Sequence, residues 1–83
     1  MRLDKFLKVS RVIKRRTVAN EICGKGRVQL NGRVAKAGSE VRVGDEILIG
    51  FGSAPVRLRV LRVTEHVRKE EADELYELLD MIQ

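Results

Sequence analysis

The chain has 83 residues, of which 43% are hydrophobic and 35% are charged, and its formal net charge is +5 at pH 7. A domain of this size has a thin core and is too small to enclose a deep substrate cavity. No apolar run approaches the roughly 20 residues that cross a bilayer, and the single cysteine, Cys23, offers neither an internal disulfide nor paired thiols for zinc. We therefore expect a cytoplasmic protein in a reducing compartment, without membrane contact.

The positive charge is concentrated in the first 36 residues. This segment holds eleven of the 17 lysines and arginines against two acids, Asp4 and Glu21, and so carries +9. Residues 37–68 carry +1, and residues 69–83 carry −5. Positive charge concentrated in this way favours binding to a polyanion, and RNA is the first candidate.

The basic segment predicts two short helices. Leu3, Phe6 and Leu7 follow the spacing of an amphipathic helix whose cations would face solvent. Thr17 is the expected N-cap of a second helix, which would end at Gly24. The basic residues would then lie on the first helix, in the linker and at both ends of the second helix.

The remainder predicts short strands and one more helix. Asn31-Gly32 is a strong signal for a two-residue hairpin turn. A bulge or bend is expected at Leu61, where the alternation of apolar residues slips. Residues 69–82 return to helical spacing and would form an acidic C-terminal helix. Extended segments are expected at residues 28–30, 33–36, 41–45, 47–51 and from 55 to about 63, with a turn at Gly44-Asp45.

The sequence has no pattern that is typical of a catalytic, cofactor or metal site. His66 stands alone in a charged stretch, and Cys23 lies on the apolar face of a predicted helix. The segment 24–26 is too short for a phosphate-binding glycine loop, and the acidic residues 70–74 suit the start of a helix. We expect a solvated histidine, a buried cysteine, no cofactor, no metal and no enzymatic activity.

Recognition of folded RNA through its backbone fits the composition best. Lysines and arginines neutralise phosphates and release counterions, whereas the scarcity of aromatic residues argues against a platform for stacking single-stranded bases. Phe6 and Phe51 lie in apolar patterns and are expected in the core, and Tyr76 is either core or partner-facing. Double-stranded DNA stays an alternative, because two short helices resemble a helix-turn-helix; such a regulator would bind specific operators as a dimer.

Three motifs together resemble the S4-type RNA-binding domain, the module of ribosomal small-subunit protein S4. They are residues 2–7 (RLDKFL), residues 15–17 (RRT) with Ala19, and residues 26–32 (GRVQLNG); residues 41–47 also resemble the family's turn into its next strand. The match covers residues 1 to about 50. We expect a single α+β domain over residues 1–83, in which two N-terminal helices pack on a small twisted antiparallel sheet of four or five strands. Residues 1–50 would form the core motif, residues 51–68 would add strands, and residues 69–82 would form the C-terminal helix.

Over its whole length the chain is most similar to the stand-alone bacterial proteins of the RqcP (YabO) type. That resemblance implies a factor of ribosome-associated quality control, and we expect the protein to be monomeric. It would bind rRNA of the large ribosomal subunit and stabilise the P-site peptidyl-tRNA, while an RqcH-type partner recruits alanyl-tRNA to build an alanine tail. The resemblance implies that Arg2 and Arg16 are the first RNA contacts. It implies that the contact extends over Lys5, Lys8, Arg11, Lys14, Arg15, Lys25, Arg27, Asn31 and Lys36.

A second group with the same module is the small ribosome-binding heat-shock protein of proteobacteria. Members of that group generally carry a longer, basic C-terminal extension, whereas residues 69–83 of this chain are acidic. This difference favours the quality-control interpretation and leaves the heat-shock rescue factor as the alternative. Both would associate with ribosomes, but only a quality-control factor would be needed for alanine tails.

Overall fold

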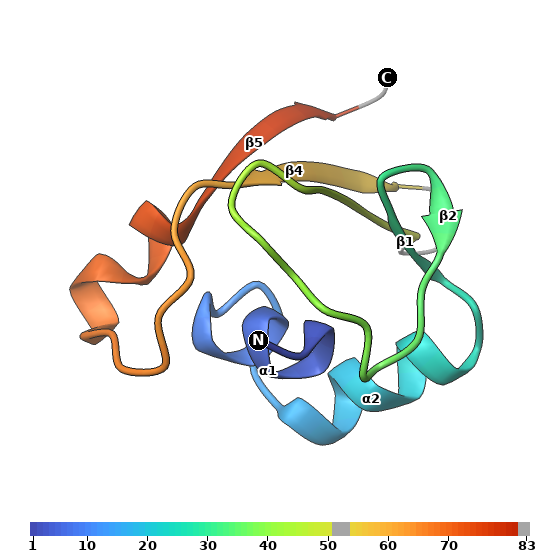
Figure 1. Ribbon diagram of the computed structural model, residues 1–83, viewed down its shortest axis with the longest axis horizontal. Coiled ribbons are helices and arrows are strands. Elements are labelled where there is room, and N and C mark those ends of the chain that lie inside the picture. Colours follow the sequence, from blue (N-terminus) through green and yellow to red (C-terminus); the bar gives the residue numbers. More distant parts are fainter. Residues whose placement is uncertain (51–53, 82–83) are drawn as a thin grey trace.

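The computed structural model describes residues 1–50 and 54–81 (Figure 1). Within these residues the strands form one antiparallel sheet in the order β2-β1-β3-β4-β5. The predicted α+β fold is therefore confirmed. The helices are α1 (Leu3–Val9), α2 (Arg16–Gly24) and the 3-10 helix η1 (Lys69–Leu75), and the strands are β1 (Val28–Leu30), β2 (Arg33–Val34), β3 (Glu46–Ile49), β4 (Val56–Val60) and β5 (Tyr76–Met81).

The core lies between one face of the sheet and the two N-terminal helices (Figure 1). From the sheet, Ile47, Ile49 and Leu58 are completely buried, and alternation along each strand sends their neighbours to the opposite face. From α1, the apolar stripe that includes Phe6 is completely buried, as its spacing predicts. Cys23 is buried in α2, and burial raises the pKa of its thiol. It acts as a small apolar core residue.

The start of α1 is fixed by a loop distant in sequence. No side chain caps this helix, but the N–H groups of Leu3 and Asp4 donate to the carbonyl oxygens of Ser39 (2.8 Å) and Ala37 (3.1 Å). These bonds satisfy two of the donors that a helix leaves unpaired at its first turn. The N–H of Val41 donates to the carbonyl oxygen of Met1 (2.8 Å). The backbone on both sides of Arg2 is thereby held against residues 37–41.

The predicted hairpin is confirmed. Asn31 and Gly32 both have positive φ angles, 53° and 84°, and they join β1 to β2. Two consecutive positive φ values are what a type I′ turn requires, and asparagine and glycine tolerate them best. The turn at Gly44-Asp45 is also present, with Gly44 at φ 94°.

The C-terminal helix is corrected. The helical spacing holds only over η1, where Ala72 and Leu75 are buried, and residues 76–81 form strand β5 instead of continuing the helix. The physical reason is the free edge of β4, which offers backbone hydrogen bonds to a whole strand, and Leu78 and Glu77 match Leu58 and Arg59 across it.

Three smaller expectations also change. The helix α2 begins at Arg16 after an extended Arg15, so Thr17 lies inside its first turn and is not the N-cap. The register between β4 and β5 shifts between Arg57 and Leu58, where β5 has one extra residue, Leu79, whereas Leu61 lies beyond the end of β4. Residues 41–45 form a loop and turn, and β2 ends at Val34. The expectation that Phe51 lies in the core falls outside the described residues.

Candidate nucleic-acid interface

A buried carboxylate organises the basic face of the molecule. Asp4, in the first turn of α1, is only 2% exposed. The Nε of Arg2 donates to its Oδ1 at 3.2 Å, and the Nε of Arg16 lies 3.5 Å from its Oδ2. The side-chain amide of Asn20 donates to Oδ2 at 3.4 Å. One carboxylate therefore joins the N-terminal segment, α1 and α2.

The carboxylate stays ionised at neutral pH. Burial by itself raises the pKa of Asp4, but the hydrogen bonds donated by Arg2, Asn20 and Arg16 outweigh it and hold the pKa below the ordinary value. The negative charge also lies at the N-terminal end of α1, where the helix dipole favours it. Asp4 is thus a permanent anchor for two guanidinium groups.

Both arginines keep a large free surface. The side chains of Arg2 and Arg16 are 54% and 47% exposed, while the Asp4 side chain is 3% exposed. A guanidinium has five N–H donors in a rigid fork, and Asp4 engages only some of them. The remaining donors can bind phosphate oxygens in the bidentate geometry that is typical of arginine. Because Asp4 already orders both side chains, a ligand would meet less of the entropy cost of fixing them.

The end of α1 and the linker supply further exposed cations. Lys8 is exposed near the end of α1, and Lys14 and Arg15 are exposed in the linker between the helices. Arg11 follows the C-cap residue of α1, Ser10, and has φ 63°. This left-handed position is the one that glycine usually occupies after a helix, so an exposed arginine is kept here at a conformational cost of about 1 kcal/mol.

Two candidate residues are engaged within the protein. The ammonium of Lys5 pairs with Glu65 in the loop before η1, and its side chain is only 32% exposed. The amide of Asn31 donates to Asp45 (3.0 Å), and its oxygen accepts from the N–H of Glu46 (3.0 Å). Lys5 therefore ties a loop to α1, and Asn31 ties the hairpin to the turn before β3. Neither side chain is poised for RNA in the way that Arg2 and Arg16 are.

The other candidates form a separate group beyond the C-terminal end of α2. Lys25, Arg27 and Lys36 are exposed around the hairpin. Arg16 begins α2 and Lys25 follows its last residue, so the nine-residue helix separates the two groups by roughly 13 Å. The basic residues therefore form two groups, one held around Asp4 and one exposed around the hairpin.

Sequence reasoning missed Asp4 and Asn20 as parts of the site. Their signal was present but weak. Asp4 stands next to Leu3 and three residues before Leu7, which places it on the buried side of the helix, and an acid at such a position requires a partner.

The described part of the chain gives little support to other kinds of site. Residues 1–50 and 54–81 contain no group of three or more histidine, cysteine, aspartate or glutamate residues that could hold a metal ion. His66 is exposed, as expected. Tyr76 is half-buried and packs against the core. Among the helices of the described residues, none is long and apolar enough to cross a membrane.

Comparison with known proteins identifies the family of this chain. The S4 domain family matches residues 1–47, which include α1, α2, the hairpin and the Asp4 cluster, that is Asp4 with Arg2, Arg16 and Asn20. The chain belongs to the S4 domain family. This S4 domain protein is 60% identical to the RQC P-site tRNA stabilizing factor of Halalkalibacterium halodurans over 78 aligned residues. The alignment covers 94% of this chain and 89% of that protein.

One further sequence relative and one solved structure are also similar to this chain. A protein of the same name from Listeria innocua is 53% identical, over 95% of this chain and 86% of that protein. The trimeric structure of Vibrio cholerae heat shock protein 15 superimposes with a TM-score of 0.87 at 30% identity, covering 95% of this S4 domain chain and 81% of the other. The resemblance inferred from the sequence motifs is confirmed.

Proposed function

We propose that this S4 domain protein is a non-enzymatic RNA-binding factor of ribosome-associated quality control. It binds rRNA of the large ribosomal subunit and stabilises the P-site peptidyl-tRNA while an RqcH-type partner extends the stalled chain with alanine. The names of its relatives support the link to quality control and to tRNA. The observation that carries the proposal is the pair of half-exposed arginines, Arg2 and Arg16, held by a buried aspartate within a segment of charge +9.

The mechanism follows from this anchoring. Arg2 comes from the N-terminal segment and Arg16 from α2, so two parts of the chain present guanidinium groups in one fixed arrangement. Such a pair selects phosphates at a matching spacing, and therefore a particular RNA shape, without reading bases. The exposed cations around α1 and the hairpin add attraction that falls as salt rises. The protein acts by holding RNA in place, and no chemical step is required of it.

A second candidate is a heat-shock rescue factor on the same subunit. The observation that favours it is the close likeness of the fold to heat shock protein 15, at a TM-score of 0.87. The higher identity to the tRNA-stabilizing factors and the acidic segment 69–83 support the quality-control function over this candidate.

Alanine tailing separates the two candidates. In a bacterial host that lacks its own copy of this protein, a reporter that stalls ribosomes should lose its alanine tails. Expression of this chain should restore the tails, and so should Glu21→Gln, which removes an exposed acid of α2. The Arg2→Gln/Arg16→Gln double variant should not restore them although it accumulates to the same level. Unchanged tails in the deletion host would contradict the quality-control function and favour the heat-shock candidate.

A further inference from the structure

The strand β5 forms an open edge of the sheet. It is the last strand in the order β2-β1-β3-β4-β5, and among residues 1–50 and 54–81 no sixth strand pairs with its outer side. At six residues it is the longest strand described. Its pairing with β4 is regular over residues 76–78 and shifts at Leu79. Residues 76–78 therefore offer backbone donors and acceptors in regular order to another extended chain.

On the face of the sheet that carries the core, a row of apolar side chains crosses the strands and ends at β5. The last side chain of this row is exposed. The register aligns Leu30 with Ile47, Ile47 with Leu58, and Leu58 with Leu78. Ile47 and Leu58 are completely buried, whereas Leu78 is 57% exposed. In Figure 1, β4 lies between β5 and the two helices, so β5 is farther from α1 and α2 than β4 is. An apolar residue on an added strand would continue the row and cover Leu78.

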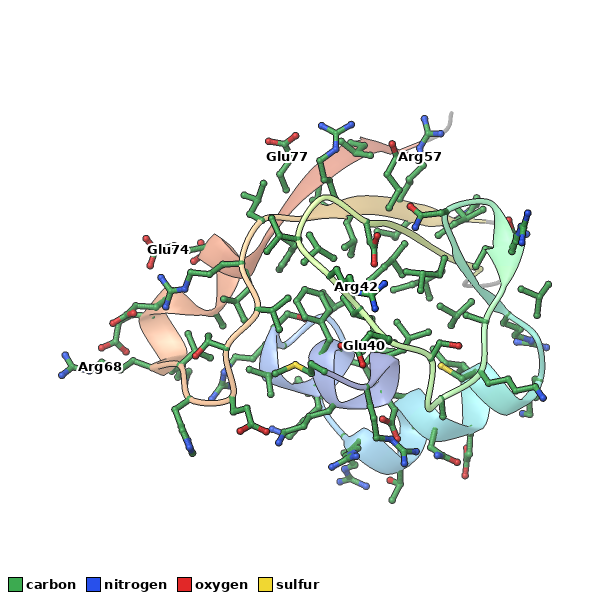
Figure 2. All side chains as sticks on the ribbon, in the orientation of Figure 1. Glu40, Arg42, Arg57, Arg68, Glu74 and Glu77 are labelled. Carbon is green, nitrogen blue, oxygen red and sulfur yellow. The ribbon has the colours of Figure 1, made fainter. Side chains whose placement is uncertain are left out.

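On the opposite face, a row of alternating charge ends at the same edge. Glu46 of β3 aligns with Arg59 of β4, and Arg59 aligns with Glu77 of β5. The guanidinium of Arg59 pairs with both carboxylates, at 3.5 Å to Glu46 and 3.2 Å to Glu77. Figure 2 shows Glu77 projecting away from the helices. Its side chain is 49% exposed, so the next position in the row favours a cation.

The charge of the edge argues against a second copy as the added strand. Residues 70–81 contain six acidic residues and no basic ones. Two copies that paired through this edge would bring two such acidic segments together, and like charges opposite each other are destabilising. An RNA strand would meet the same repulsion. The edge is therefore suited to a chain that brings positive charge.

We propose that the β5 edge is a docking site for an extended segment of a partner protein in which basic and apolar residues alternate. The segment adds as a sixth strand, with a lysine or arginine opposite Glu77 and an apolar side chain opposite Leu78. The site lies on a different surface from the Asp4 cluster, so it goes beyond the proposed RNA-binding function and does not rest on it.

The test uses the full chain and a defined peptide. The probe is a six-residue peptide of alternating lysine and valine, the length of β5, blocked at both ends, and its control replaces lysine by glutamate. Binding is followed by the NMR shifts of backbone amides and by slowed hydrogen exchange in β5. Glu77→Lys should weaken binding by roughly tenfold. Glu70→Lys makes the same charge change in η1 and should have a much smaller effect. Thermal melts check that both variants fold.

The outcomes separate the proposal from general electrostatics. Shifts and protection confined to residues 76–81 and their β4 neighbours, lost in Glu77→Lys only, would support strand addition. Equal losses in both variants, equal binding of the glutamate peptide, or shifts spread over η1 would overturn it. An RNA oligonucleotide that produced the β5 shifts in place of the peptide would also overturn it. Self-association through β5, seen as concentration-dependent protection of the free protein, would assign the edge to a second copy and contradict the proposal.

Discussion

Asp4→Asn separates the positioning of arginines from their charge. The substitution keeps the shape of the side chain but removes the negative charge that Arg2 and Arg16 share. It also raises the net charge of the protein by one. General electrostatic attraction alone would then give RNA binding that is equal or tighter. The anchoring described above predicts weaker binding, because both guanidinium groups would have to be ordered by the RNA itself.

The size of the effect follows from the contacts. Ordering an arginine side chain at an interface costs about 0.5–1.5 kcal/mol. Losing the anchor for two arginines should therefore weaken RNA binding by about 1–2 kcal/mol, or roughly 5- to 30-fold. A hydrogen bond to a charged group contributes about 1.5–3 kcal/mol to stability, but both arginines are half-exposed and their bonds to Asp4 are 3.2 to 3.5 Å long. Solvent screening reduces the expected loss of stability to about 1–2 kcal/mol, a fall in Tm of about 5–10 °C.

Two measurements on the same variant test this reasoning. Binding to a ribosomal RNA fragment is measured by titration at several salt concentrations and at a temperature below the melting range of the variant. Thermal unfolding is followed separately by circular dichroism. Glu21→Gln is the matched control, because it makes the same charge change on the exposed side of α2. If Asp4→Asn bound RNA as tightly as Glu21→Gln did, Arg2 and Arg16 would not depend on their anchor and the reasoning would be refuted.

Three further predictions test neighbouring features of the site. Arg16→Gln should weaken RNA binding several-fold more than Arg15→Gln in parallel titrations, although both remove one charge, since only Arg16 is held by Asp4; equal losses would contradict the special place of Arg16. Arg11→Gly should raise the free energy of unfolding in urea by about 0.5–1 kcal/mol, because glycine accepts the φ of 63°, and it should weaken RNA binding; a destabilised variant would show that the Arg11 side chain supports the fold. Because the pKa of Asp4 is lowered in the folded protein, its stabilisation is present above its unfolded pKa of about 3.9 and is lost as pH falls through the folded value. The difference in Tm between wild type and Asp4→Asn should therefore be constant at neutral pH and shrink below about pH 4; a difference that did not change with acid would mean that the Asp4 charge is not its source.

Local chemistry made much of the fold predictable. The hairpin at Asn31-Gly32 follows from two residues that accept positive φ, and α1 follows from the spacing of its apolar residues. The spacing of Leu75 and Leu79 predicts a helix where the chain forms β5, because these residues fit helical spacing as well as they fit the edge of a sheet. Only the pairing with β4, some 20 residues earlier in the chain, decides between the two.

The candidate site was predictable in its charge but not in its geometry. Clustering of basic residues identifies the segment, and the resemblance to the S4 domain singles out Arg2 and Arg16. The reason that these two differ from Arg15 is a contact with Asp4, which lies twelve residues before Arg16. In the same way, only the folded chain shows that Lys5 is occupied by Glu65, sixty residues later. Such long-range pairs leave no periodic signal in a single sequence.

The most direct test of the central claim is sedimentation of the tagged protein from a bacterial lysate, with sequencing of the RNA in each fraction. The wild-type chain should migrate with large ribosomal subunits that carry tRNA and nascent chains, and this association should be lost as salt rises. Asp4→Asn and Arg16→Gln should shift toward the top of the gradient while Glu21→Gln stays with the subunits. Wild-type protein that stayed at the top of the gradient, or that migrated with DNA, would contradict the claim that this face binds ribosomal RNA.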